Sequence, residues 1–219
     1  MGELVMVIGK SGSGKSTSLR NFEPDEVGVF SCAGKRLPFR KRLKVANTSD
    51  YATIEAKLLE NGKRAYVIDD STYLMQFRAF EFAKVKGYDK FVEMAVDFEH
   101  LLETARMTSP DTITYFLHHP QFADDGAAKP QTVGKMLDNQ LNVEGLFPIV
   151  IEARLKDGKH VFVTKNDGQN IAKSPMGMLP EVMDNDLKAV DTAIREYWGM
   201  APLTGAHAPA DDLGDIPFA

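Results

Sequence analysis

The stretch LVMVIGKSGSGKST, residues 4–17, joins an uninterrupted apolar run to a segment of glycine, serine and lysine. Residues 4–8 predict a strand buried on both faces, because a solvent-facing side would require alternating polar residues. After the glycine-rich segment we expect a helix from Lys15 to about Phe22. The order of strand, glycine-rich loop and helix is the structural context of a phosphate-binding loop.

Residues 9–16 satisfy the phosphate-loop pattern G-x-x-x-x-G-K-[ST] at every fixed position. Glycines allow successive backbone N–H groups to point inward at phosphate oxygens, and the helix N-terminus adds a partial positive charge. We expect Lys15 to reach the β- and γ-phosphates, Ser16 to place its hydroxyl on Mg²⁺, and Thr17 to support the helix start. The predicted nucleotide-contacting residues are Gly9, Lys10, Ser11, Gly12, Ser13, Gly14, Lys15, Ser16 and Thr17.

Two aspartates end a second apolar run, RAYVIDD at residues 64–70. Asp69 is the candidate that holds the metal's water shell with Ser16, because a phosphate loop needs a second carboxylate. Asp70 stands where many P-loop ATPases carry the carboxylate that polarises the attacking water. It would be a weak general base unless its pKa were raised. The alternative for Asp70 is an N-cap of the following helix.

Two histidines, His118 and His119, end the strand predicted over residues 111–119. In a parallel sheet the carboxyl ends of the strands line the ligand crevice, so one imidazole could sense the γ-phosphate. We prefer His119 for this role, and a purely structural histidine is the alternative. The predicted catalytic set is therefore Lys15, Asp70 and His119.

Strands alternate with amphipathic helices up to Pro120, which predicts an α/β fold with a mainly parallel central sheet covered by helices on both faces. Beyond Pro120 we expect a polar loop over 121–132, a short helix over 134–141 and a C-terminal β-hairpin that turns at Asp157-Gly158. We predict one domain over residues 1–199 and a disordered acidic tail over 200–219. The remaining predicted strands are 26–33 and 44–50, and the remaining helices are 51–62, 73–85, 91–107 and 185–198.

The formal net charge of −5 argues against a protein that coats nucleic acid by bulk charge. Its single cysteine, Cys32, excludes an internal disulfide and a cysteine-based metal cluster. No apolar run approaches the roughly 18 residues of a membrane span, and the N-terminus lacks the features of a secretory signal. We therefore expect no membrane partner and a cytoplasmic location.

Several blocks beyond the phosphate loop carry a family resemblance. They are KRLPFR (35–40), YVIDDSTYLM (66–75), FLHHP (116–120), AKSPMGM (172–178) and MDNDLK (183–188). Together they resemble a family of phage-encoded P-loop ATPases with a RecA-type core, related to the Sak-type single-strand annealing proteins. The resemblance spans roughly residues 4–199, and the blocks AKSPMGM and DNDLK are not general features of phosphate-loop proteins.

The resemblance implies a RecA-like fold, binding of ATP, and a role in phage DNA recombination or replication on single-stranded DNA. It also implies a homo-oligomer, a ring or a filament, in which a basic residue of the neighbouring subunit contacts the nucleotide. Lys135 and Lys173 are the candidates for that contact. The family pattern has a small polar residue before its histidine, where this chain has His118.

A basic segment offers a candidate surface for single-stranded DNA. Residues 35–44, KRLPFRKRLK, carry six cations and no anion. A groove that follows the DNA backbone needs cations and a stacking aromatic ring. The alternatives are a solvated basic loop or one that meets the neighbour's nucleotide. The candidate DNA-binding residues are Lys35, Arg36, Phe39, Arg40, Lys41 and Arg42.

The last residues, DDLGDIPFA at 211–219, resemble the acidic tip of bacterial single-stranded-DNA-binding proteins, which ends in Asp-Asp-Ile-Pro-Phe. Here Ala219 follows the phenylalanine and moves the terminal carboxylate by one residue. We expect this tail to recruit recombination partners or to occupy the protein's own basic groove. A plain solubilising tail is the alternative. The residues concerned are Asp211, Asp212, Asp215, Ile216, Pro217 and Phe218.

Three function classes fit these features. The first is an ATP-dependent recombination protein that binds or anneals single strands. The second is a non-hydrolysing, ATP-switched module such as a helicase loader, which needs no polarising carboxylate. The third is a small-molecule kinase, which is disfavoured because it needs an arginine-rich lid, and the chain after residue 120 has only Arg154 before Arg195.

Overall fold

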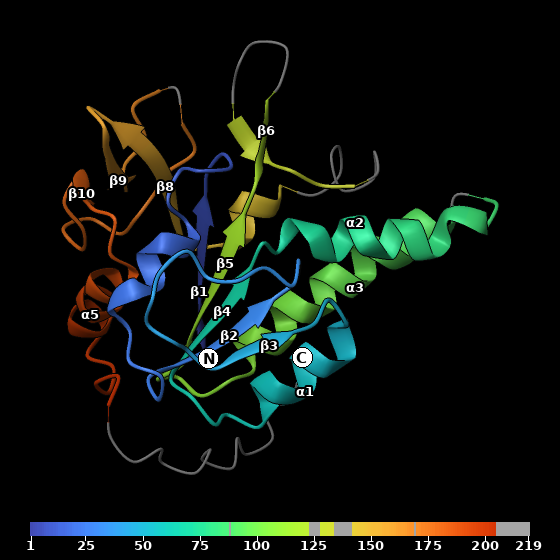
Figure 1. The fold of residues 1–219 in the computed structure, drawn as a ribbon, viewed down its shortest axis with the longest axis horizontal. Coiled ribbons are helices and arrows are strands. Elements are labelled where there is room, and N and C mark those ends of the chain that lie inside the picture. Colours follow the sequence, from blue (N-terminus) through green and yellow to red (C-terminus); the bar gives the residue numbers. More distant parts are fainter. Residues whose placement is uncertain (88, 123–127, 134–141, 169, 205–219) are drawn as a thin grey trace, which may run out of the picture.

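The structure, a computed structural model, describes residues 1–87, 89–122, 128–133, 142–168 and 170–204. At its centre is an eight-stranded sheet in the order β10-β9-β8-β1-β5-β4-β2-β3 (Figure 1). Neighbours from β8 to β3 pair in parallel, whereas β9 and β10 add antiparallel pairs at one edge. A mixed α/β protein with a large, mainly parallel sheet is therefore confirmed. The strands are β1 Glu3–Ile8, β2 Val27–Ser31, β3 Val45–Asn47, β4 Ala65–Asp69, β5 Ile113–His118, β8 Ile149–Lys156, β9 Lys159–Val163 and β10 Val182–Asp184.

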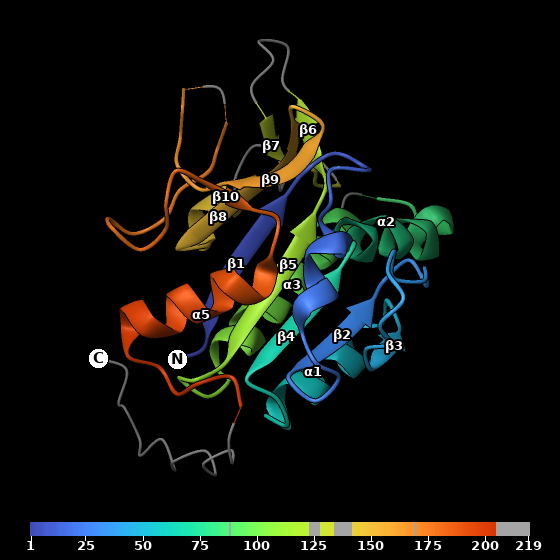
Figure 2. The same cartoon turned by 60° about the vertical axis from the view of Figure 1, so that its left-hand side comes forward.

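Helices cover both faces of this sheet, because successive side chains of a strand point to opposite sides. Leu4 and Met6 of β1 join a buried cluster with the first three α-helices, whereas Val5 and Val7 join a second cluster with η1 and α5. Figure 2 shows α5 in front of the sheet and α3 behind it. The helical elements are η1 Ser16–Asn21, α1 Tyr51–Leu59, α2 Thr72–Glu81, η2 Phe82–Lys84, α3 Asp89–Arg106, η3 Val143–Leu146 and α5 Leu187–Trp198.

The carboxyl ends of β1, β5 and β4 meet at one edge of the sheet, because these neighbours run in the same direction. The glycine-rich loop follows β1, β5 ends at His118, and β4 ends at Asp69. β5 lies between the other two strands. The strand order therefore places the histidine pair between the loop and the aspartates.

Local sequence explains where the helices begin and end. Asp50 is the N-cap residue of α1, and its carboxylate accepts a hydrogen bond from the Thr53 amide. We expected this helix to end at Gly62, but it ends at Leu59. Just after its end, Asn61 adopts a left-handed conformation (φ 48°), which a short polar side chain permits.

Two further predictions need correction. Residues 16–21 form a 3-10 helix and not a regular helix over 15–22, and the Ser18 hydroxyl donates to the Lys15 carbonyl at 2.6 Å. Such local side-chain bonds compete with regular helical turns. The predicted polar loop 121–132 contains an antiparallel pair, β6 Pro120–Phe122 with β7 Ala128–Pro130. The short helix predicted over 134–141 lies outside the described residues.

The hairpin of β8 and β9 turns at the predicted pair. Asp157 and Gly158 both have positive φ, 50° and 74°, as a tight two-residue hairpin turn requires. β10 was not predicted, because its three residues carry no strand pattern. Among the described residues, no helix is both long and apolar enough to cross a lipid bilayer.

The predicted tail starts too early. Met200 and Leu203 pack against the second core cluster, and the Pro202 carbonyl accepts a hydrogen bond from Arg64 at 2.6 Å. The Ala201 amide also donates to the Asp111 carboxylate at 2.8 Å. These contacts hold residues 200–204 against the domain, and the rest of the tail lies outside the described residues.

Candidate functional site

The glycine-rich loop curls tightly at the edge of the sheet. Gly12 and Gly14 have φ values of 77° and 99°, which side chains other than glycine rarely adopt. A Cβ on Gly9 would lie 2.4 Å from the Ser13 hydroxyl and 2.6 Å from the Ala153 carbonyl oxygen. The glycines are thus required by backbone conformation and by close packing, as expected of a loop whose amides line a concavity.

Lys15 is folded back over this loop. Its side chain is buried, and its ammonium group donates to the carbonyl oxygens of Gly9 at 2.6 Å and Lys10 at 3.3 Å. Burial lowers the pKa of Lys15 to about 8, and the charge of Lys35 adds to this lowering. The nearby carboxylates of Asp70 and Asp69 oppose it only in part.

Ser16 and Asp69, the predicted metal pair, are in direct contact although 53 residues separate them. The Ser16 hydroxyl donates to an oxygen of Asp69 at 2.8 Å. Burial raises the pKa of Asp69, and the hydrogen bond from Ser16 offsets part of that rise. A buried carboxylate of this kind favours a neighbouring positive charge.

Asp70 turns its carboxylate into the site and not toward α2. Its backbone is left-handed, with φ of 60°, and its two oxygens contact Lys35 Nζ at 2.8 Å and His119 Nε2 at 3.0 Å. The N-cap alternative is therefore wrong, because the cap residue of α2 is Ser71. Burial alone would raise the pKa of Asp70, but hydrogen bonds from His119 and Lys35 outweigh it and hold the pKa at about 2.

The two histidines have different environments. His118 is fully buried, with Nε2 2.8 Å from the Gln131 carbonyl oxygen and Nδ1 2.9 Å from the Ser71 hydroxyl. Burial lowers the pKa of His118 to about 4, so this imidazole is neutral at pH 7. His119 faces the aspartates. Because ionised Asp70 can only accept, Nε2 of His119 carries the proton in their contact.

The side chains described above, with the exception of His118, line a cavity of about 250 Å³. It brings together the predicted lysine, the serine–aspartate pair, Asp70 and His119, which come from three different parts of the chain. Arg36 and Lys35, which we had assigned to DNA, also line it. The lining residues are Ser11, Gly12, Gly14, Lys15, Ser16, Thr17, Lys35, Arg36, Pro38, Asp69, Asp70 and His119.

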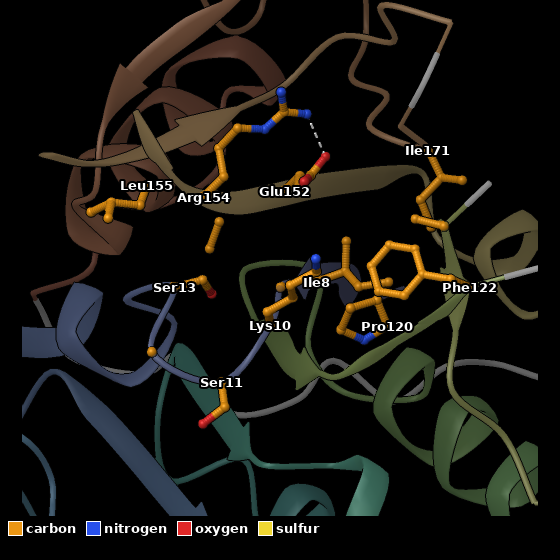
Figure 3. Close-up of a pocket in the computed structure, with 14 residues that line it drawn as sticks. Ile8, Lys10, Ser11, Ser13, Pro120, Phe122, Glu152, Arg154, Leu155 and Ile171 are labelled. Carbon is orange, nitrogen blue, oxygen red and sulfur yellow. Dashed lines mark hydrogen bonds and ion pairs between the residues drawn. The ribbon is translucent and has the colours of Figure 1, made fainter. Parts of the chain in front are cut away.

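A second cavity, of about 530 Å³, lies against the first half of the loop (Figure 3). The Lys10 ammonium group lies 4.7 Å from the centre of the Phe122 ring, and Arg154 pairs with Glu152 at 2.6 Å. Lys10 lines this cavity and not the one that contains the aspartates. Its predicted contact with a nucleotide stays a prediction.

The predicted DNA-binding residues all line one groove of about 510 Å³, and Lys35 and Arg36 also line the 250 Å³ cavity. Phe39 is half-buried and packs against the core, so its ring is only partly available for stacking. Lys41 forms an ion pair with Glu23 at 2.8 Å.

Arg40 and Arg42 are exposed and line this groove of about 510 Å³. Lys35 and Lys41, which also line it, pair with the carboxylates of Asp70 and Glu23. Lys173 exchanges backbone hydrogen bonds with Val150 at 2.8 and 2.9 Å and lines neither cavity beside the loop. The other subunit-contact candidate, Lys135, and the predicted tail residues Asp211, Asp212, Asp215, Ile216, Pro217 and Phe218 lie outside the described residues.

Sequence reasoning missed three residues that support the loop and the helix after it. His160 of β9 approaches the Ser13 carbonyl oxygen at 3.1 Å, and Arg20 of η1 donates to the Asn185 carbonyl at 2.5 Å. Asn185 lies in the block DNDLK, but no spacing in the sequence connects that block to the loop. The side-chain nitrogen Nδ2 of Asn185 and the hydroxyl of Ser13 are buried with no hydrogen-bond partner among the described residues.

No protein-family model matches this chain, and no curated protein matches it either. Among the described residues, no group of three His, Cys, Asp or Glu side chains could hold a metal by protein ligands alone. Fold and site together define an α/β protein in which a phosphate-loop motif faces two aspartates and a histidine.

Proposed function

We propose that this chain is a P-loop ATPase with a RecA-like core that binds ATP and Mg²⁺ between the glycine-rich loop and Asp69. The observation that carries the proposal is the convergence of Lys15, the Ser16–Asp69 pair and the Asp70–His119 pair on one cavity. The ends of three adjacent parallel strands supply or adjoin these groups, which is where open α/β sheets bind ligands.

The residues present fit this ligand pair. Loop amides and Lys15 suit a chain of phosphates, and Gly12 leaves open space beside its Cα, with nothing within 4 Å of an added Cβ. Ser16 and Asp69 suit a magnesium ion, which binds through one or two side-chain oxygens, phosphates and water. Bound Mg²⁺ supplies neutralisation of phosphate charge. Asp69 orients that metal's water shell, and Lys15 holds the phosphate oxygens.

Asp70 limits what the site does after binding. With a pKa of about 2 it is ionised at neutral pH, so it can orient a water molecule but is a poor acceptor of that water's proton. Lys35 and His119 occupy its oxygens. We therefore expect slow hydrolysis. The same observation favours the second candidate, a non-hydrolysing module switched by ATP.

The proposed role on DNA rests on the family resemblance and on the exposed arginines of the basic segment. Arg40 and Arg42 line a groove at the end of the segment that begins beside the nucleotide cavity. We propose that the protein acts on single-stranded DNA in phage recombination, in the host cytoplasm, as a ring or filament. Lys135 and Lys173 remain the proposed contacts with a neighbour's nucleotide, and the acidic tail the proposed site for recombination partners.

Calorimetry with ATP and Mg²⁺ tests the site. We expect binding by the wild type and none by Lys15→Met, and unchanged affinity in this variant would refute the proposal. Phosphate release with and without a single-stranded oligonucleotide then separates the functions. Release stimulated by DNA supports the recombination ATPase, and binding without release supports the switch. Release that requires a nucleoside acceptor would indicate a kinase.

A further inference from the structure

Lys35 occupies an unexpected position for a residue of a basic surface segment. It lies in the connection between β2 and β3, and its ammonium group reaches Asp70 at 2.8 Å. The same group lies 5.0 Å from the centre of the Tyr73 ring. Lys35 thus lines the 250 Å³ cavity together with residues of the phosphate loop.

The cavity holds two lysines and two aspartates. Lys15 and Lys35 are close enough for the charge of Lys35 to help lower the pKa of Lys15, so both ammonium groups act on the same small space. Two like charges that face one cavity disfavour each other and favour a polyanion between them.

Lys35 is also free to change partners. Its side chain is 59% exposed, whereas the carboxylate it contacts is 11% exposed. Because the ammonium group is exposed and sits on a flexible four-carbon stem, Lys35 can exchange Asp70 for another anion while Asp70 keeps its contact with His119. Asp70, by contrast, is fixed by the strand end and by His119.

We propose that Lys35 recognises the terminal phosphate of a nucleoside triphosphate, in the same chain as the phosphate loop, by exchanging Asp70 for that phosphate. This inference rests on the proposed function and deepens it. A diphosphate lacks the group that Lys35 would meet, so with a diphosphate the Lys35–Asp70 pair stays closed. With a triphosphate, the exchange releases one oxygen of Asp70 to orient water. Lys35 therefore distinguishes ATP from ADP.

Calorimetry with ATP–Mg²⁺ and ADP–Mg²⁺ tests this on the full-length chain, in the wild type, Lys35→Met and Lys35→Arg. We expect Lys35→Met to weaken ATP about tenfold, as for loss of a charge-assisted hydrogen bond at a partly exposed site, and to change ADP less than about twofold. Lys35→Arg should keep most of the preference for ATP. Lys44→Met is the matched control, because Lys44 ends the same basic run but pairs with exposed Asp25 at 2.5 Å.

Each other result overturns the inference. Equal loss for ATP and ADP would mean that Lys35 only holds Asp70 in place, and no loss would mean that it does not meet the nucleotide. If Lys35→Met loses oligonucleotide binding while its ratio of ATP affinity to ADP affinity is unchanged, Lys35 contributes to DNA binding and not to nucleotide recognition. The proposed function fails separately: if Lys15→Met binds ATP normally, or the wild type binds none, both ideas fall. If Lys15→Met loses ATP and Lys35→Met does not, only the role of Lys35 falls.

Discussion

Replacing Lys15 by Met should make the nucleotide-free protein more stable while it removes ATP binding. Lys15 is the central residue of the proposed site, yet only 5% of it is exposed and its ammonium group has two backbone carbonyls as hydrogen-bond partners. Burial of a charge without a carboxylate in direct contact is unfavourable. Methionine has a similar length and no charge, so it fills the same space without that cost.

The magnitude follows from the pKa of Lys15. A fall from 10.5 to about 8 corresponds to about 3 kcal/mol against the charged form, at about 1.36 kcal/mol for each pKa unit. The substitution also leaves the Gly9 carbonyl without its donor, which costs about 1 kcal/mol. We therefore expect unfolding to cost about 2 kcal/mol more in Lys15→Met than in the wild type at pH 7, a rise in Tm of about 4–8 °C.

The size of this difference depends on pH. Between about pH 8 and 10.5 the unfolded chain holds a proton on Lys15 that the folded chain has lost, so wild-type stability from this group rises with pH over that window. Below pH 8 the full cost is present. The advantage of Lys15→Met should therefore be largest at pH 7 and should shrink by pH 10.

Urea unfolding at pH 7 and at pH 10, with and without ATP–Mg²⁺, measures these differences. The control is Lys44→Met, which removes an exposed lysine and should change stability by less than about 0.5 kcal/mol at either pH. ATP–Mg²⁺ at about 100 times its Kd should stabilise the wild type by about 2.7 kcal/mol and leave Lys15→Met unchanged. A Met variant that is less stable than the wild type at pH 7, or a difference independent of pH, would refute the reasoning.

The remaining predictions concern the aspartates and the exposed arginines. Asp69→Asn should weaken ATP at least about tenfold in calorimetry with Mg²⁺ but little with chelator, and an equal loss in both would argue against a metal role. Asp70→Asn should keep ATP affinity within about threefold and slow phosphate release more than about tenfold. The wild-type rate of phosphate release should show no step from Asp70 near pH 4, because the pKa of Asp70 is about 2. Arg40→Gln with Arg42→Gln should weaken oligonucleotide binding and reduce its salt slope by about 1.4, and an unchanged slope would remove this surface from the proposal.

Residues whose role depends on local pattern were predicted well from the sequence. The apolar runs before Gly9 and Asp69 fixed two strands, and the spacing of the phosphate-loop motif placed Lys15 and Ser16. Their meeting with Asp69 followed from the parallel direction of the strands, which alternation with helices already indicated. The sequence was therefore enough to predict that charged side chains meet at the end of buried strands.

Residues whose role depends on distant packing were not predicted. Lys35 is one cation among six in its segment, and only the connection from β2 to β3 turns it toward Asp70. His160 and Asn185 approach the loop because β9 and β10 extend the sheet beside it. A helix cap stayed an open alternative for Asp70, because the sequence does not reveal that its backbone is left-handed.

Without a ligand, burial disfavours the charged forms of both Lys15 and Asp69, and it shifts their pKa values in opposite directions. Burial pushes Lys15 toward losing its proton and Asp69 toward gaining one, although the two lie in the same cavity. Their mutual attraction offsets these pKa shifts only in part, because Lys15 donates to loop carbonyls and Asp69 accepts from Ser16. A phosphate chain beside the lysine and a divalent cation beside the aspartate would reverse both shifts at once. A site selected only for the stability of the domain would hold apolar groups here, as the two core clusters do. The unfavourable burial of both charges is thus a physical argument in favour of the proposed ligand, which carries charges of both signs.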